Sequence, residues 1–110
     1  MVGFVASNVI RGDDRQVHVD DWDDGLSGRA ALIDVRTRGE FAAGRIPDAV
    51  NIPIEELRGR IAEIPRDRPV VVHCQVGMRG YMAARILRQA GIDAANLAGG
   101  YKTYRMFHPE

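Results

Sequence analysis

The only cysteine of the chain stands where a strand is expected to lead into a helix. Cys74 follows the apolar, β-branched run 70–72 and precedes a stretch with two glycines and an arginine. In open α/β sheets, active sites lie beyond the carboxyl ends of the strands, where a loop can turn several backbone N–H groups toward one centre and bind an anion. We therefore interpret Cys74 as a catalytic nucleophile. Its predicted substrate-binding loop comprises Gln75, Val76, Gly77, Met78, Arg79 and Gly80.

The expected surroundings of Cys74 favour its thiolate over its thiol. The partial positive charge of a helix N-terminus, inward-facing N–H groups and the guanidinium of Arg79 all stabilise a negative sulfur. The thiolate is the nucleophilic form of cysteine, so we predict that the reaction needs no general base. Gly77 would permit a tight turn, and Gly80 would let a backbone or ligand approach closely.

The histidines are not expected to take part in the chemistry. His73 directly precedes Cys74, but neighbouring strand residues point to opposite faces of a sheet, so we expect its imidazole to make a structural hydrogen bond beneath the loop. His18 and His108 have no metal-ligand spacing to a thiol or a carboxylate, and we predict no metal site. A single cysteine also excludes an internal disulfide and a multi-cysteine zinc site.

Short apolar strands that alternate with helices are expected to position the loop. The predicted strands cover residues 17–19, 31–35, 49–52, 69–73 and 94–97, with a short helical or turn segment over 20–26 and no element assigned after residue 100. Such alternation implies parallel strands joined by crossovers. The predicted architecture is therefore α/β, with a central parallel five-stranded sheet and helices on both faces.

Three helices are predicted between these strands. Thr37 and Glu40 have the spacing of a capping box for a brief helix that Gly44 ends. Apolar residues recur at helical spacing over 54–64, which predicts one helix there. A further helix is expected over 80–90, directly after the cysteine loop.

The composition fits one small globular domain. The chain has 110 residues and a mass of 12.2 kDa, with 45% hydrophobic and 27% charged residues. We predict an N-terminal arm or linker over residues 1–16 and one domain over residues 17–107. Fifteen basic residues balance fifteen acidic ones, which argues against nucleic-acid binding, and neither a membrane-spanning run nor a secretory signal pattern is present. A soluble, cytoplasmic protein is expected.

Several motifs in order resemble those of single-domain rhodaneses, which are sulfurtransferases. Residues 32–36 resemble the first signature of that family, and residues 40–41, 44–49 and 51–53 together resemble the second. Residues 74–79 match the active-site loop, and residues 97–100 match the glycine pair near the end of the domain. The resemblance covers about residues 17–105 and implies a rhodanese-like fold.

The resemblance implies sulfur transfer in two steps. The Cys74 thiolate would take sulfane sulfur from thiosulfate, a polysulfide or a low-molecular-weight persulfide and become a cysteine persulfide. A nucleophilic acceptor (a thiol, cyanide or sulfite) would then remove that sulfur, as in a thiosulfate:cyanide sulfurtransferase. The loop amides would cradle the persulfide, and Arg79 would steer an anionic donor. Asp34 and Arg36, at the end of a neighbouring strand, would pair with each other and support the loop.

A closer resemblance is to the rhodanese domain at the C-terminus of coenzyme A-disulfide reductase–type flavoproteins, on residues 3–13 and 100–104. It implies a flavoprotein reductase module as partner within a longer parent protein, and coenzyme A thiol or persulfide among the small-molecule acceptors and donors. The chain itself has no G-x-G-x-x-G loop and is too short to hold FAD and a nicotinamide site, so we expect no cofactor.

Three positions depart from the family pattern. Arg45 stands where histidine is common, Gly80 where serine or threonine often follows the loop arginine, and Tyr104 where tryptophan is common. The missing hydroxyl at Gly80 removes a donor near the sulfur and bears on substrate preference. We interpret the other two as packing variants.

Two other functions fit the same residues. A cysteine followed by glycine and arginine also resembles the loop of cysteine-dependent phosphatases and arsenate reductases, but Cys74 and Arg79 enclose four residues where those enzymes have five. The smaller cradle would suit a single sulfur better than a tetrahedral phosphate. The other alternative is a non-catalytic rhodanese-like regulatory module, although such modules commonly lose the cysteine that this chain retains.

Overall fold

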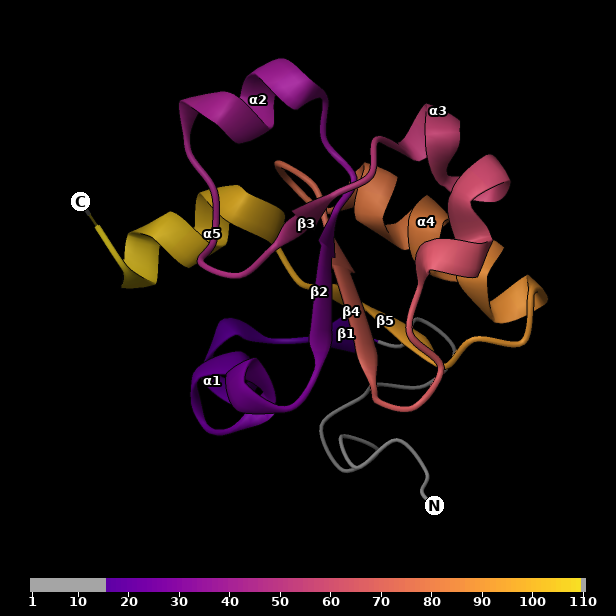
Figure 1. Ribbon diagram of the computed structural model, residues 1–110. Coiled ribbons are helices and arrows are strands. Elements are labelled where there is room, and N and C mark those ends of the chain that lie inside the picture. The colour runs from indigo at the N-terminus through magenta and orange to yellow at the C-terminus, as the bar shows by residue number, and fades with distance from the viewer. Residues whose placement is uncertain (1–15, 110) are drawn as a thin grey trace.

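The computed structural model describes residues 16–109 and has a five-stranded parallel sheet at its centre (Figure 1). The strands are β1 (Gln16–Val17), β2 (Ala31–Asp34), β3 (Val50–Asn51), β4 (Val70–His73) and β5 (Ala94–Leu97). Their order across the sheet is β1-β5-β4-β2-β3, and every neighbouring pair is parallel. The predicted five-stranded parallel sheet is confirmed, but its first strand ends at Val17 instead of residue 19, because Val19 already begins a helix. Residues 1–15 of the predicted N-terminal arm lie outside the described residues.

Helices cover both faces of the sheet, as predicted. One face carries α1 (Val19–Asp23), the 3-10 helix η3 (Leu26–Gly28) and α5 (Gly100–Phe107) (Figure 1). The opposite face carries α3 (Ile54–Leu57), the 3-10 helix η4 (Arg58–Glu63) and α4 (Met78–Gln89).

Side chains that alternate along β4 fill both halves of the core. Val70 and Val72 pack with residues of α3 and α4, whereas Val71 packs with residues of α1 and α5. A strand buried on both faces must be apolar at successive positions, which accounts for the β-branched run before the cysteine. The central strand is therefore held from both sides up to the point where Cys74 follows it.

The carboxyl ends of the inner strands meet at one edge of the sheet. In the parallel register, Asp34 of β2 lies opposite His73 of β4, and Asn96 of β5 lies opposite Val72. Residues from both neighbouring strands are thereby placed beside the loop that begins at Cys74.

Helix α2 (Arg38–Ala43) follows β2 and begins at the predicted capping box. The Glu40 N–H donates to Thr37 Oγ1 at 3.1 Å, and Glu40 Oε1 accepts from the Thr37 N–H at 2.9 Å. Gly44 ends the helix, as predicted. This cap fixes the Glu40 carboxylate at the start of α2.

Three expectations about helices were wrong. The single helix predicted over 54–64 is divided into α3 and η4, with a non-helical residue at Arg60, because Gly59 weakens the helix at the junction. Helix α4 begins at Met78 rather than at residue 80, because Gly77 adopts a left-handed conformation (φ 111°) that turns the chain into the helix earlier. A further helix, α5, begins at Gly100, where glycines serve as a helix start.

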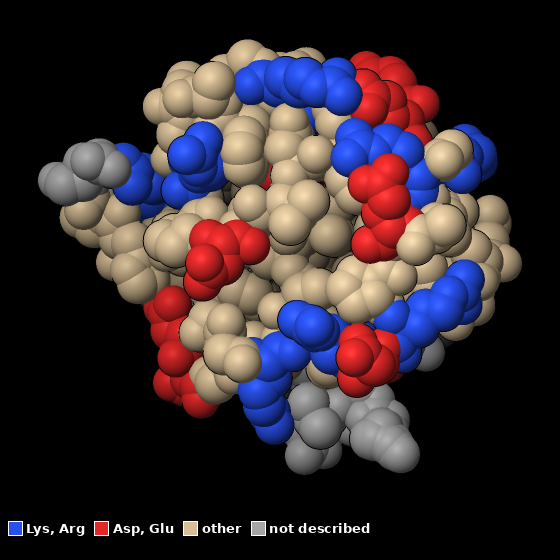
Figure 2. Space-filling model, viewed as in Figure 1, with Lys and Arg blue, Asp and Glu red and all other residues tan. Residues whose placement is uncertain are grey.

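Charged side chains of both signs lie beside one another on the face seen in Figure 2, around an uncharged centre. Positive and negative charges, which are equal in number in the whole sequence, are thus also mixed on this face. Within residues 16–109, no helix combines the length and the apolar character needed to cross a membrane.

Candidate active site

The Cys74 thiol lies directly after β4, at the N-terminal end of α4. The residue is only 1% exposed. The Gly77 N–H donates to Cys74 Sγ at 3.0 Å, and Gly77 is the residue before the first turn of α4. The sulfur is therefore contacted by a backbone donor at the positive end of a helix, a position that stabilises negative charge.

Helix α5 holds the carbonyl groups of the loop. The Tyr101 N–H donates to the Cys74 carbonyl oxygen at 2.7 Å, and the Lys102 N–H donates to the Gln75 carbonyl oxygen at 2.9 Å. In a trans peptide the C=O and the following N–H point in opposite directions. Because these two carbonyl groups face α5, the N–H groups of Gln75 and Val76 point away from it.

Gly100 permits this close approach. Its φ is +62°, and a Cβ atom there would overlap the Cys74 carbonyl oxygen and lie 2.8 Å from the Gln75 carbonyl carbon. The second glycine of the family motif is thus the point where the loop and the start of α5 touch backbone to backbone.

Arg36 is buried between β2 and the loop, with 2% of its side chain exposed. Its Nη2 donates to Asp34 Oδ2 and to the Gly44 carbonyl oxygen, both at 2.7 Å, and its Nη1 donates to Gln75 Oε1 at 3.3 Å. The guanidinium carbon also lies 4.3 Å from the centre of the Tyr101 ring. One side chain thus links β2, the end of α2, the loop and α5.

The His73 imidazole lies beneath the loop and does not contact the sulfur. Its Nδ1 is 3.2 Å from the Cys74 carbonyl oxygen, which agrees with the predicted structural hydrogen bond. Burial lowers the pKa of His73, and this effect exceeds the opposing charge of Asp34, whose Oδ2 is 3.6 Å from Nε2. The ring is therefore neutral at neutral pH, since its ordinary pKa is already 6.5.

Arg79 lies in the first turn of α4 and is paired with Glu40 of α2. Arg79 Nη1 donates to Glu40 Oε1 at 2.9 Å, and Nη2 donates to Oε2 at 3.0 Å, a two-pronged geometry that suits guanidinium and carboxylate groups. Hydrogen bonding to Arg79 is the main cause that lowers the Glu40 pKa from 4.5 to about 2. Glu40 was not among the predicted site residues; its place in the capping box was the available signal.

This ion pair should make folding stability depend on pH in the acid range. The pKa of Glu40 in the folded protein lies below its unfolded value, so the pair contributes stability above about pH 4.5 and loses it as the pH falls toward 2. We expect the free energy of unfolding to fall more steeply over this interval in the original protein than in Glu40→Gln, whose amide cannot titrate. Chemical denaturation of both proteins across the interval tests this, and parallel curves would contradict it.

Asn96 of β5 also contacts the loop and was missed by sequence reasoning. Its side chain is buried, and Nδ2 donates to the Gly77 carbonyl oxygen at 3.1 Å. The other amide atom, Oδ1, is buried without a hydrogen-bond partner and faces Gly80. A Cβ atom at Gly80 would overlap Asn96 Oδ1 and lie 3.1 Å from Asn96 Cγ. The asparagine therefore accounts for the glycine that replaces the usual hydroxyl residue.

The two positions should be coupled in stability. Gly80→Ala is expected to destabilise the protein by about 1–3 kcal/mol, because the added methyl group collides with a buried amide that cannot move freely. In the double variant Gly80→Ala, Asn96→Ala, the collision is absent, so the total loss should be smaller than the sum of the two single losses. Urea denaturation of the four proteins measures this difference; strict additivity would contradict the assignment.

Part of the rim of the site is apolar. Val76 is 60% exposed and Met78 is 72% exposed, and Met82 follows Met78 by one turn of α4 and is also exposed. A group approaching Cys74 from solvent therefore meets apolar side chains next to the loop.

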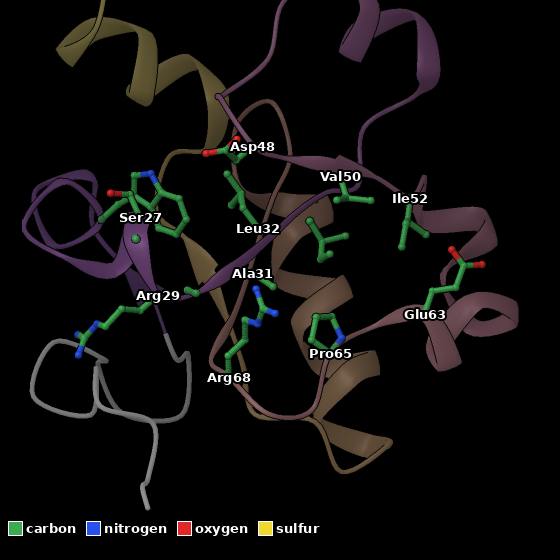
Figure 3. Close-up of a pocket in the computed structure, with 14 residues that line it drawn as sticks. Ser27, Arg29, Ala31, Leu32, Asp48, Val50, Ile52, Glu63, Pro65 and Arg68 are labelled. Atoms are coloured by element: carbon green, nitrogen blue, oxygen red, sulfur yellow. The ribbon is translucent and has the colours of Figure 1, made fainter.

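A separate cavity of about 380 Å³ opens beside the N-terminal half of β2 (Figure 3). β3 pairs only with Ile33 and Asp34, so the preceding residues Ala31 and Leu32 line the cavity instead of contacting a strand on that side. Arg29, Arg68 and Glu63 also line it, and no residue of the cysteine loop does. This cavity is not part of the site around Cys74.

A parallel sheet with a cysteine loop at the start of a helix is the arrangement of a rhodanese type of fold and site. The sequence model of the family described as Rhodanese-like domain matches residues 18–106. The chain belongs to this family. It is 42% identical over 93 residues to the human thiosulfate:glutathione sulfurtransferase, covering 71% of this chain and 81% of that protein. It is 46% identical over 70 residues to a sulfurtransferase of Allochromatium vinosum, covering 63% of this chain and 65% of that protein.

Solved structures agree with this assignment. The reduced Bacillus anthracis CoADR-RHD superposes with a TM-score of 0.80 at 40% identity, covering 86% of this chain and 17% of that chain. The resemblance to the coenzyme A-disulfide reductase type of rhodanese domain is thereby confirmed. The human single-domain sulfurtransferase TSTD1 superposes with a TM-score of 0.75 at 34% identity, covering 90% of this chain and 99% of that chain.

Proposed function

We propose that this protein is a sulfurtransferase in which Cys74 carries sulfur as a persulfide. The observation that carries the proposal is the hydrogen bond from the Gly77 N–H to Cys74 Sγ, 3.0 Å long, at the N-terminal end of α4. A backbone N–H that already points at the sulfur stabilises the thiolate before the sulfur-donating substrate binds. The N–H also needs no rearrangement during the reaction. Relatives named as sulfurtransferases support the same function.

In the first step, the Cys74 thiolate attacks the sulfane sulfur of thiosulfate, a polysulfide or a low-molecular-weight persulfide. A new S–S bond forms at Sγ, and the S–S bond of the donor breaks, so that sulfite or a thiolate leaves with the electron pair. In the second step, an acceptor such as a thiol, cyanide or sulfite attacks the outer sulfur. Cys74 then leaves as a thiolate, and no external oxidant or reductant is consumed.

The loop amides receive the outer sulfur in this proposal. The carbonyl groups of Cys74 and Gln75 are held by α5, which turns the N–H groups of Gln75 and Val76 away from that helix. The first N–H groups of α4, from Met78 to Gly80, have no acceptor within their own helix because every helix leaves its first donors free. We assign contact with the persulfide to these amides, because the Arg79 guanidinium is occupied by Glu40.

Asp34 and Arg36 support the loop in the same proposal. Arg36 is buried, is held by the Asp34 carboxylate and reaches both Gln75 and the Gly44 carbonyl oxygen. A buried guanidinium with this many partners is better suited to hold the backbone than to meet a substrate. We assign it the role of a positioning residue.

The relatives suggest which small molecules and which partner module the protein works with. The human relative is a thiosulfate:glutathione sulfurtransferase, and the Bacillus anthracis structure is named CoADR-RHD, of which this chain spans 17%. We propose low-molecular-weight thiols, coenzyme A among them, as acceptors or as carriers of the donor sulfur. A flavoprotein reductase module would be the partner if the chain belongs to a longer protein.

A comparison of acceptors tests the proposal. Cys74 is first loaded with sulfur from thiosulfate, and release of that sulfur to cyanide, sulfite, glutathione and coenzyme A is then timed. We expect release to all nucleophiles that can enter, with a marked advantage for a thiol. Failure to release sulfur to any of them, combined with steady hydrolysis of a phenyl phosphate that requires Cys74, would replace sulfur transfer by phosphatase activity.

A further inference from the structure

The charge of Arg79 at the mouth of the loop is balanced by Glu40. Two nearly equal hydrogen bonds, at 2.9 and 3.0 Å, join the guanidinium to the carboxylate. A second hydrogen bond fixes the orientation of the Glu40 carboxylate, because its Oε1 also accepts from the Thr37 N–H at 2.9 Å. With a pKa of about 2, the Glu40 carboxylate is ionised at every pH at which a cysteine thiolate can react.

The charge of Arg79 lies at the same helix end as the sulfur. Arg79 is in the first turn of α4, and Gly77, directly before that turn, donates to Cys74 Sγ at 3.0 Å. Glu40 must therefore offset part of the attraction that Arg79 exerts on an anion approaching Cys74. The other arginine that touches the loop, Arg36, is likewise paired with a carboxylate, that of Asp34.

The loop also offers apolar contact beside the Arg79–Glu40 pair. Val76 and Met78 belong to the loop and are exposed, and Met82, one turn further along α4, lines a shallow hollow together with Arg58 and Arg85. An inorganic dianion such as thiosulfate gains little from these side chains. A donor with an organic group attached to the sulfur can bury that group against them.

From these contacts we propose that Glu40 is a specificity-determining residue. By pairing with Arg79 it lowers the attraction of the site for doubly charged inorganic sulfur donors, in favour of organic sulfane-sulfur donors that carry at most one negative charge next to the reacting sulfur. The inference rests on the proposed sulfurtransferase function and names the class of donor that this site takes.

The test uses two donors that react alike but differ in charge. Thiosulfate is a dianion, and benzenethiosulfonate is a monoanion with an apolar ring. In each case the Cys74 thiolate attacks the terminal sulfur, a new S–S bond forms at Sγ, and the donor S–S bond breaks with release of sulfite or benzenesulfinate. The value of kcat/KM is measured with both donors at a fixed, saturating concentration of cyanide.

Glu40→Gln removes the negative charge but keeps the size of the side chain and an oxygen that can accept from Arg79. A change of one unit charge acts twice as strongly on a dianion as on a monoanion, so kcat/KM should rise about tenfold for thiosulfate and only about threefold for benzenethiosulfonate. Both gains should shrink as salt is added, because the new attraction is screened. A purely structural role for Glu40 would change the two donors equally.

Two variants and one salt series complete the design. Glu56→Gln is the matched control, because Glu56 pairs with Arg38 and Arg60 at the surface and contacts no residue of the loop; its donor ratio should equal that of the original protein. Adding Arg79→Gln to Glu40→Gln should abolish the gain. If Glu40→Gln does not fold, the original protein alone is informative, since a balanced site predicts that kcat/KM for thiosulfate depends only weakly on ionic strength.

The outcomes separate the inference from the function on which it rests. A donor ratio unchanged by Glu40→Gln, or a steep dependence of the original protein on salt, overturns the role of Glu40 while sulfur transfer stands. If neither donor ever adds sulfur to Cys74, the sulfurtransferase proposal itself fails, and the role of Glu40 fails with it.

Discussion

Replacing Cys74 by alanine is expected to abolish sulfur transfer and to leave the fold nearly intact. Cys74 Sγ is the atom that forms the covalent bond to the transferred sulfur, and the chain has no other cysteine that could take its place. The substitution removes one small side-chain atom at the edge of the core, so the free energy of unfolding should change by about 1 kcal/mol or less. Thiocyanate formation from thiosulfate and cyanide measures the activity, and thermal unfolding measures the stability.

Cys74→Ser serves as the companion variant because serine keeps a hydrogen-bond acceptor for the Gly77 N–H. An alcohol is not ionised at neutral pH, so this variant should also be inactive. Substantial thiocyanate formation by either variant would show that sulfur transfer does not pass through residue 74.

Gly100→Ala is expected to have the second-largest effect, on both stability and activity. The φ of +62° strains any residue with a Cβ atom, and the new methyl group would overlap the Cys74 carbonyl oxygen. The first turn of α5 would have to move away from the loop and lose the Tyr101 and Lys102 hydrogen bonds. We expect a loss of about 2–5 kcal/mol in the free energy of unfolding and a fall in kcat in the molecules that remain folded.

Gly59→Ala is the matched control for this variant. Gly59 lies in η4, and a Cβ atom there would meet nothing within 4 Å. The substitution should therefore leave activity unchanged and alter stability only slightly. If Gly100→Ala is as stable and as active as Gly59→Ala, then the contact between α5 and the loop does not hold the site in place.

The parts of the site that lie close together in the sequence could be predicted from it. The apolar run of β4, the glycine in the turn and the helix after it place Cys74 at the end of a buried strand without any further information. The capping box of α2 was likewise readable, because it depends only on Thr37 and Glu40. These features are governed by local backbone geometry and by the burial of consecutive apolar side chains.

The parts that depend on distant segments were not predictable in the same way. Glu40 meets Arg79, and Asn96 meets Gly77 and Gly80, only because parallel strands bring their carboxyl ends to the same edge of the sheet. Nothing about Asn96 as a residue type marks it as a partner of the loop. The helical start at Gly100 was missed because glycine is a poor helix former, whereas here its conformation is needed for contact with the cysteine loop.

The central claim is that backbone donors around Cys74 let its sulfur carry a second sulfur atom. The most direct measurement is the intact mass of the protein after treatment with thiosulfate and removal of excess donor, followed by peptide mapping. The claim predicts a gain of one sulfur atom per chain, located on residue 74, and its loss on addition of cyanide. A protein whose mass stays unchanged with thiosulfate, and equally with a polysulfide or an organic donor, would contradict it.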